Sequence, residues 1–157
     1  MADIDILIRP DGFGNYDLQL SADGTQFRGA EGFETAIPTS LFTDARAPAS
    51  AVADPIRRRG WIGNLLTLDI NRELGGLVWL YEQSRLTVDL LNQIRVAARQ
   101  AVNWMVEDGV VLEIDVTTRV IDSRSIEILI QWTGRDNAVD EFAVIWRRTQ
   151  SNLLTAL

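Results

Sequence analysis

Residues 112–147 read LEIDVTTRVIDSRSIEILIQWTGRDNAVDEFAVIWR, and this stretch decides the fold because its apolar residues recur at every second position. Such a repeat is typical of strands with one buried face, and turn-forming residues at 122–124 and 134–137 divide it into three runs. The residues expected on the buried face are Leu112, Ile114 and Val116, then Ile126, Ile128, Ile130 and Trp132, then Phe142, Val144 and Trp146. Three strands joined by short turns predict an antiparallel meander.

The segment before the meander, residues 87–109, has helical spacing instead. Its apolar residues follow at steps of three and four, which predicts one long amphipathic helix. The apolar positions are Leu91, Ile94, Ala98, Ala101 and Met105. Thr87 is placed to cap the helix start, Asp89 lies in the first turn, and Gly109 is placed to end the helix. Residues 74–82 are apolar and contain Trp79, so they predict a second, shorter helix beside the first.

The beginning of the chain contains two short alternating runs and a helical one. The alternating runs are Ile4, Ile6 and Ile8, then Tyr16, Leu18 and Leu20. Turn residues at 10–12 separate them, so we expect a β-hairpin. Residues 32–44 predict a short helix that is kinked or restarted at Pro38, because proline has no backbone N–H to donate. Residues 45–55 are rich in alanine and proline and predict a surface loop.

Together these elements predict one α+β domain over residues 1–157. It has an N-terminal β-hairpin, short helices, one long amphipathic helix and a C-terminal three-stranded antiparallel meander. Residues 147–157 end in leucines and form a candidate C-terminal arm. With 46% hydrophobic residues, a chain of this length can bury a core of its own. No apolar run approaches the roughly 18 residues that a membrane span needs, and the first residues lack the pattern of a secretory signal.

The composition also limits the chemistry that the chain can perform. It contains no histidine, no cysteine and no lysine, so all 15 positive charges are arginines. This removes imidazole bases, thiolate nucleophiles, Schiff-base lysines and the commonest metal ligands. We therefore expect no cofactor and no metal site. The net charge of −7 argues against binding to nucleic acid, which requires an excess of positive charge.

Carboxylates are the remaining route to catalysis. Glu31, Glu34 and Asp44 lie near one another in sequence, and a carboxylate pair is what glycoside hydrolysis uses. Acidic residues at helix starts and in loops are more often caps or solvated charges, so we favour a role without catalysis. A cell-wall glycan hydrolase stays open as an alternative. So does a stand-alone module that binds a peptide or glycan through some of the five tryptophans.

One loop gathers the features of a contact surface. The dense basic run Arg57-Arg58-Arg59 is expected to be solvated or paired with acidic neighbours, as most such runs are. Trp61 lies beside it between two glycines, where stacking by an arginine or contact with a partner is as plausible as burial. Arginine in place of lysine suits protein interfaces, because the guanidinium forms paired bonds with carboxylates and stacks on aromatic rings.

Five short motifs carry a resemblance to a known family. They are TAI at residues 35–37, SLFTD at 40–44, RRGWIGN at 58–64, LVWL at 77–80 and WMVEDGV at 104–110. In this order and spacing, the chain resembles the Mu-like phage tail baseplate wedge family, which is related to the lysozyme-like tail wedge proteins. The resemblance covers nearly the whole domain and keeps the order of its elements.

The resemblance implies a structural component of a contractile phage tail baseplate and not an enzyme. The expected partners are other baseplate wedge proteins, the spike or hub, and the first ring of tail sheath, without nucleic acid or membrane. The expected location is the virion tail baseplate, after synthesis in the host bacterial cytoplasm. The candidate partner-binding residues are Asp44 and Arg46 in one loop, and Arg57, Arg58, Arg59 and Trp61 in another. The strand at residues 140–147, or the N-terminal strand, is expected to pair with a sheath strand.

Overall fold

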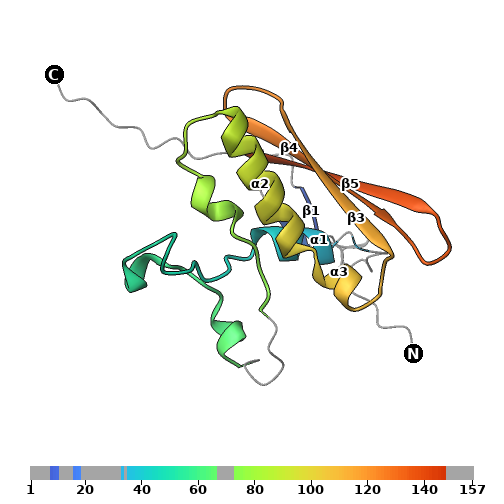
Figure 1. Cartoon of the computed structure of the whole chain (residues 1–157), viewed down its shortest axis with the longest axis horizontal. Helices are drawn as coiled ribbons and strands as arrows, with labels where there is room; N and C mark the ends of the chain where they lie inside the picture. The colour runs from blue at the N-terminus through green and yellow to red at the C-terminus, as the bar shows by residue number, and fades with distance from the viewer. Residues whose placement is uncertain (1–7, 11–15, 19–32, 34, 67–72, 148–157) are drawn as a thin grey trace.

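The computed structural model describes residues 8–10, 16–18, 33, 35–66 and 73–147, and Figure 1 shows the whole chain. A three-stranded sheet forms one layer, and a long helix, α2, lies across one of its faces. The shorter helices lie beside α2, and a segment between α1 and α2 projects away from both layers. This arrangement confirms the predicted α+β class.

The sheet consists of β3 (Glu113–Val120), β4 (Ser125–Thr133) and β5 (Val139–Arg147) in the order β3-β4-β5. Both pairs are antiparallel, with Val116 opposite Ile130 and Ile130 opposite Phe142. The predicted meander is therefore confirmed. One position differs, because Leu112 is 54% exposed while Val111 is buried. The N–H of Val111 bonds back to Met105, so the strand alternation begins only after Leu112.

The turn between β3 and β4 depends on one carboxylate. Asp122 accepts backbone hydrogen bonds from the N–H groups of Arg124 and Ser125, at 2.7 and 2.8 Å. These bonds, that of Arg124 first, lower the pKa of Asp122 because they favour its charged form. The contribution of Asp122 to stability is therefore complete above the pKa of an unfolded aspartate. It is lost as the pH falls through the lower pKa of the folded state.

Replacing Asp122 with asparagine tests this acid dependence, since the amide oxygen still accepts the hydrogen bonds but does not titrate. We expect the stability of the wild type to fall more steeply than that of Asp122→Asn as the pH drops below the unfolded pKa. Urea unfolding followed by circular dichroism at several acidic pH values measures this difference. Parallel pH profiles for the two proteins would contradict the assignment.

The long helix is shorter than predicted and is followed by a separate turn of helix. α2 spans Val88–Ala101 and α3 spans Trp104–Glu107, so the expectation of one helix to residue 109 was wrong. The helical hydrogen-bond pattern changes at this point. The N–H of Asn103 bonds to the carbonyl of Gln100, three residues back, and not to the carbonyl four residues back. Thr87 caps the start of α2 as predicted, whereas Gly109 follows α3 and not one long helix. Thr87 accepts a hydrogen bond from the N–H of Leu90, and Gly109 has a φ of +62° after α3.

Contacts with α1 (Ala36–Phe42) explain the break after α2. The indole of Trp104 donates a 3.0 Å hydrogen bond to the hydroxyl of Ser40 on α1. Met105 is fully buried, as is Val102 at the break itself. If α2 continued in a straight line, these side chains would lie further along its axis and away from these positions. Packing against the rest of the fold therefore ends α2, although the apolar spacing of the sequence continues.

Two further helices differ from their predictions. α1 is not kinked at Pro38, because the helix begins at Ala36 and Pro38 falls in its first turn, where the N–H needs no partner within the helix. In place of the helix predicted at residues 74–82, there is one 3₁₀ turn, η4 (Val78–Tyr81), which packs against α2. The N-terminal hairpin is confirmed, with β1 (Ile8–Pro10) antiparallel to β2 (Tyr16–Leu18).

The core lies between α2 and the inner face of the sheet, with α1 and α3 closing its sides. Its largest fully buried side chains are Ile37, Leu41, Ile94, Met105, Ile126, Ile128 and Ile130. No helix in the described part of the chain is long and apolar enough to cross a membrane. The predicted strand residues Ile4, Ile6 and Leu20 lie outside the described residues, and so does the candidate C-terminal arm beyond residue 147.

Candidate partner-binding arm

The segment at residues 45–66, called the arm here, projects from the rest of the molecule, which we call the body (Figure 1). It begins with a loop, as predicted for residues 45–55, and continues through two 3₁₀ turns. These are η1 (Pro55–Arg57) and η2 (Ile62–Leu65). The arm holds five of the six candidate contact residues, and Asp44 lies directly before it.

Backbone contacts fix the root of the arm. The N–H of Gly76 donates to the carbonyl of Thr43 at 2.9 Å, and the N–H of Ala45 donates to the carbonyl of Gly76 at 3.0 Å. Gly75 adopts a φ of +120°, and a Cβ added there would lie only 2.5 Å from the carbonyl oxygen of Thr43. Only glycine fits such a close approach of two backbones.

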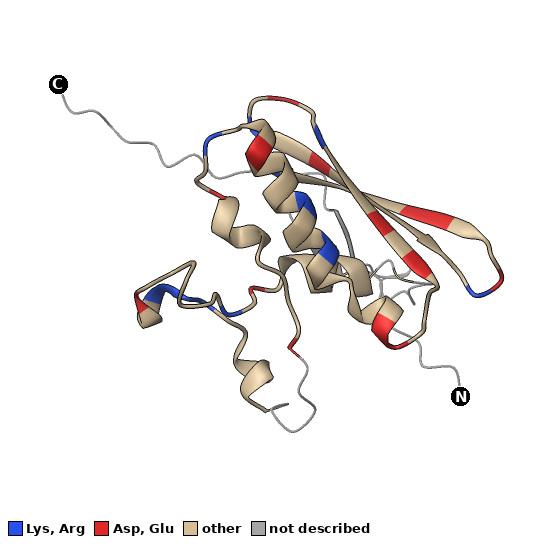
Figure 2. Ribbon diagram, viewed as in Figure 1, with Lys and Arg blue, Asp and Glu red and all other residues tan. Residues whose placement is uncertain are grey.

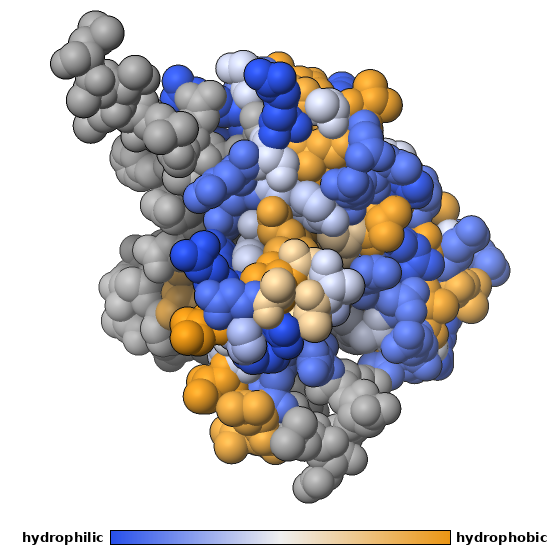
Figure 3. Space-filling view, turned by 60° about the vertical axis from the view of Figure 1, so that its left-hand side comes forward, coloured by the Kyte–Doolittle hydropathy of each residue, from blue (hydrophilic) through white to orange (hydrophobic). Residues whose placement is uncertain are grey.

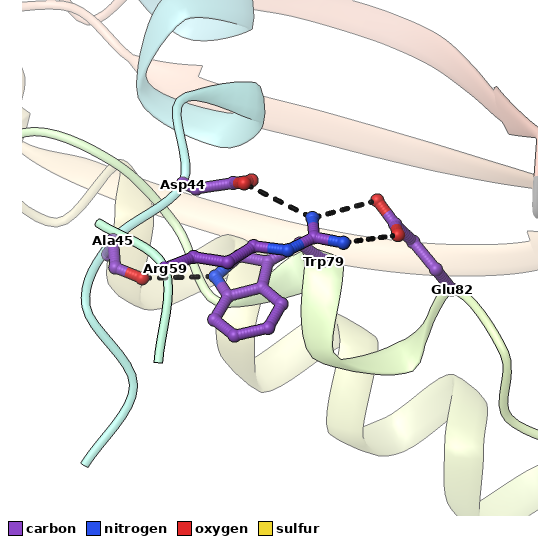
Figure 4. Close-up of polar contacts among 5 residues, drawn as sticks. All are labelled: Asp44, Ala45, Arg59, Trp79 and Glu82. Carbon is purple, nitrogen blue, oxygen red and sulfur yellow. Dashed lines mark hydrogen bonds and ion pairs between the residues drawn. The ribbon is translucent and has the colours of Figure 1, made fainter. Parts of the chain in front are cut away.

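Arg59 fastens the arm to the body through its side chain (Figure 4). One guanidinium nitrogen lies 3.1 Å from Asp44, and another lies 3.1 Å from Glu82. The same group stacks over Trp79 at 4.6 Å from the ring centroid, and the indole N–H of Trp79 donates to the carbonyl of Ala45 at 3.0 Å. The hydrogen bond to Glu82 is the main cause of a raised Arg59 pKa. We call Asp44, Arg59, Trp79 and Glu82 the arginine clamp.

Other side chains hold the arm in shape. Arg46 donates to the carbonyls of Arg59 and Pro55, both at 3.3 Å. Arg58 donates to two carbonyls of the loop, those of residues 52 and 53, at 2.9 and 3.1 Å. Asn64 joins the far end of the arm to the body, because its side chain both donates to and accepts from the backbone of Leu74 at 2.9 Å. The arm is therefore braced at its root, along its length and at its end.

Trp61 is half exposed, and no arginine of the described residues stacks on it. Its ring lies against Gly63, where an added Cβ would come within 2.2 Å of a ring carbon. The arginine stacking that the structure describes occurs at Trp79, where Arg59 lies over the ring. Since 45% of Trp61 remains accessible, the residue is available to a partner.

Comparison with known proteins places the chain in a family. The family model described as "Phage protein GP46" matches residues 33–139, which is more than half of the chain. The chain belongs to the GP46 family of phage proteins. It is also 29% identical over 122 residues to "Baseplate protein gp46" of Escherichia phage Mu, covering 76% of this chain and 82% of that protein. The resemblance to a Mu-like tail family inferred from the sequence is confirmed.

The GP46 match runs from before α1 to the first residue of β5, so it contains the whole arm and the whole clamp. The candidate contact residues predicted from the sequence were Asp44, Arg46, Arg57, Arg58, Arg59 and Trp61. The structure joins Asp44 to Arg59 and gives Arg46 and Arg58 backbone partners within the arm. Arg57 is 82% exposed at the side chain and lies 3.5 Å from Asp54.

Sequence reasoning missed Glu82 and Asn64, which also join this GP46 arm to the body. Glu82 is 23 residues from Arg59 and Asn64 is ten residues from Leu74, so no local spacing connects them. The only signal in the sequence was their position relative to the quoted motifs. Asn64 is the last residue of RRGWIGN, and Glu82 lies shortly after LVWL.

Of the three carboxylates considered for catalysis in this GP46 chain, the structure describes only Asp44. Asp44 is bonded to Arg59, while Glu31 and Glu34 lie outside the described residues. Within the ranges that the structure describes, no three acidic side chains gather in a way that could hold a metal ion.

Proposed function

We propose that this chain is a structural, non-catalytic subunit of a contractile phage tail baseplate. In this proposal it docks onto other wedge proteins around the central spike and helps to initiate assembly of the sheath. The observation that carries the proposal is membership of the GP46 family together with similarity to the Mu baseplate protein over most of both chains.

The construction of the arm supports docking. Arg46, Arg58, Arg59 and Asp44 hold the arm in place, while Arg57 and Trp61 remain accessible at its surface. A segment that is ordered before binding loses less conformational entropy when it binds, so a braced arm favours tight assembly. In this reading the candidate residues divide into four that shape the arm and two that contact a neighbouring wedge protein.

The edge of the sheet supports the proposed role in sheath assembly. β5 is the last strand of the order β3-β4-β5, so one of its edges has no strand partner among the residues that the structure describes. An edge strand can accept an extended segment of another protein through backbone hydrogen bonds. We assign residues 140–147 to pairing with a strand of the first sheath ring.

Co-expression with the neighbouring tail proteins of its gene cluster tests the proposal, with sizing and mass determination of the products. The wild type is expected to form a stable complex. Arg57→Glu and Trp61→Ala are each expected to weaken it at least about tenfold, as substitutions at central contact residues do. Arg124→Glu makes the same change of charge at an exposed turn of the body and serves as the control. A wild-type chain that stays monomeric with every tail protein would contradict the proposal.

A further inference from the structure

The end of the arm exposes three large aliphatic side chains within five consecutive residues, 62–66. Ile62 is 76% exposed, Leu65 is 63% exposed and Leu66 is 86% exposed. They lie in η2 or directly after it, and we call these three residues the apolar tip. Figure 3 shows hydrophobic residues gathered at the lower end of the molecule, where the arm ends in Figure 1. Side chains of the same type in the body, such as Ile94, are fully buried.

The local geometry presents the tip to one side. In a 3₁₀ turn the side chains at positions i and i+3 eclipse, so Ile62 and Leu65 share a face. The turn is closed by a 2.9 Å hydrogen bond from the N–H of Leu66 to the carbonyl of Gly63. Asn64, between them, is buried and anchored on both its amide atoms to Leu74. The polar residue of the turn therefore faces the body, while the aliphatic residues face outward.

We propose that the apolar tip inserts into an apolar groove with an acidic rim on a different baseplate protein and so anchors this chain in the assembly. This inference rests on the proposed function and names the contact and the chemistry of the partner. It adds three aliphatic residues outside the candidate set to the contact that we assign to Arg57 and Trp61, while Arg46, Arg58 and Arg59 keep the arm in shape. A contiguous exposed apolar surface of this kind marks an interaction site.

Charge indicates the acidic rim. The arm carries four arginines, at positions 46 and 57–59, and one aspartate, Asp54, which gives +4 − 1 = +3. The remainder of the chain therefore carries −7 − 3 = −10. Figure 2 shows positive residues along the arm and acidic ones recurring along the sheet. A partner groove bordered by carboxylates would complement the arm and fix its orientation.

A second copy of the chain does not offer such a groove in the described residues. The largest of three surface grooves, about 600 Å³ between α2 and β3, is bordered by one acid, Asp89, and one arginine, Arg95. A groove of about 180 Å³ at the arm root has Glu73 and Arg46. The third, about 190 Å³ between α2 and η4, is lined by no charged residue. Because these three grooves of the described residues lack an acidic rim, we place the complementary surface on another protein.

Site-directed cross-linking of the co-expressed complex tests the proposal, because the chain has no cysteine and a single one can be introduced. Leu66→Cys, carrying a photoreactive maleimide, is expected to cross-link to another baseplate protein at a peptide with apolar and acidic residues. Val88→Cys at the start of α2 is 84% exposed, close to the exposure of Leu66, and is the matched control, expected to give less than about a tenth of that yield.

A second measurement uses serine substitutions, which remove apolar area from exposed positions without disturbing the core. The triple variant Ile62→Ser/Leu65→Ser/Leu66→Ser is expected to weaken the complex at least about tenfold. Raising the ionic strength is expected to weaken the wild-type complex, because salt screens the charges around the tip. Val88→Ser/Ile121→Ser, both exposed on the body and away from β5, is expected to leave it unchanged. Unfolding curves of the isolated variants establish that all are folded.

The outcomes separate this proposal from the proposed function. A wild-type complex that the triple variant also forms at full strength would overturn the tip as the anchor while leaving the baseplate assignment standing. Cross-links from residue 66 to a second copy of the chain would overturn the identity of the partner. Absence of any complex with the wild type would contradict both proposals.

Discussion

Replacing Gly75 with alanine is expected to lower the free energy of unfolding by about 2–4 kcal/mol, from backbone strain and a steric clash. The residue has a φ of +120°, and the new Cβ would lie 2.5 Å from the carbonyl oxygen of Thr43 and 2.9 Å from the nitrogen of Ala45. Both neighbours are backbone atoms, so relief requires the root of the arm to separate from the body. The hydrogen bonds between Gly76 and residues 43 and 45 would be weakened with it.

Urea unfolding followed by tryptophan fluorescence measures the loss, and limited proteolysis within residues 45–66 reports whether the arm has become detached. Gly134→Ala is the matched control. Its Cβ would meet the carboxylate of Asp136, the movable end of a side chain, and we expect a loss below about 1 kcal/mol. Equal stability of the two variants would show that the arm root is not a constrained junction.

Reversing the charge of Arg59 is expected to destabilise the chain by about 1–3 kcal/mol, since two partly exposed ion pairs and one cation–π contact are lost together. The new carboxylate would also lie beside Asp44 and Glu82, so repulsion replaces attraction. The side chain of Arg59 is 44% exposed, and solvent screening keeps the loss within this range. The arm should also become more sensitive to protease.

A charge exchange makes the test specific. Arg59→Glu/Glu82→Arg restores one opposite pair across the same gap and should recover part of the stability that Arg59→Glu loses. Arg119→Glu is the control, because it breaks a 2.8 Å ion pair with Glu127 on the sheet that involves no tryptophan. We expect it to cost less than about 1 kcal/mol. A loss as large as that of Arg59→Glu would remove any special role for the clamp.

The elements with a strict local pattern could be predicted from the sequence. The alternation at Ile126, Ile128 and Ile130 specified the central strand, and Thr87 specified the start of α2. The break after α2 could not be predicted, because the apolar spacing continues to Met105 and the break depends on the contact of Trp104 with a residue 64 positions earlier. Pro38 was overinterpreted, since its effect depends on where in the helix it falls.

The site was predicted only in part, for a similar reason. The arginine run and Trp61 drew attention to the segment that forms the arm, but the role of each arginine depends on partners brought close by the fold, above all Glu82 and the ring of Trp79. The apolar tip could not be predicted from the sequence. Ile62, Leu65 and Leu66 have the composition of core residues, and only their exposure distinguishes them.

The protein content of purified tail particles tests the central claim, a place in the baseplate, most directly. Tails isolated from the producing bacterium can be analysed by mass spectrometry and labelled with an antibody against this chain under the electron microscope. Our account predicts that the chain is present in intact tails and that the label gathers at the baseplate end. Complete, sheathed tails that contain none of the chain would contradict it.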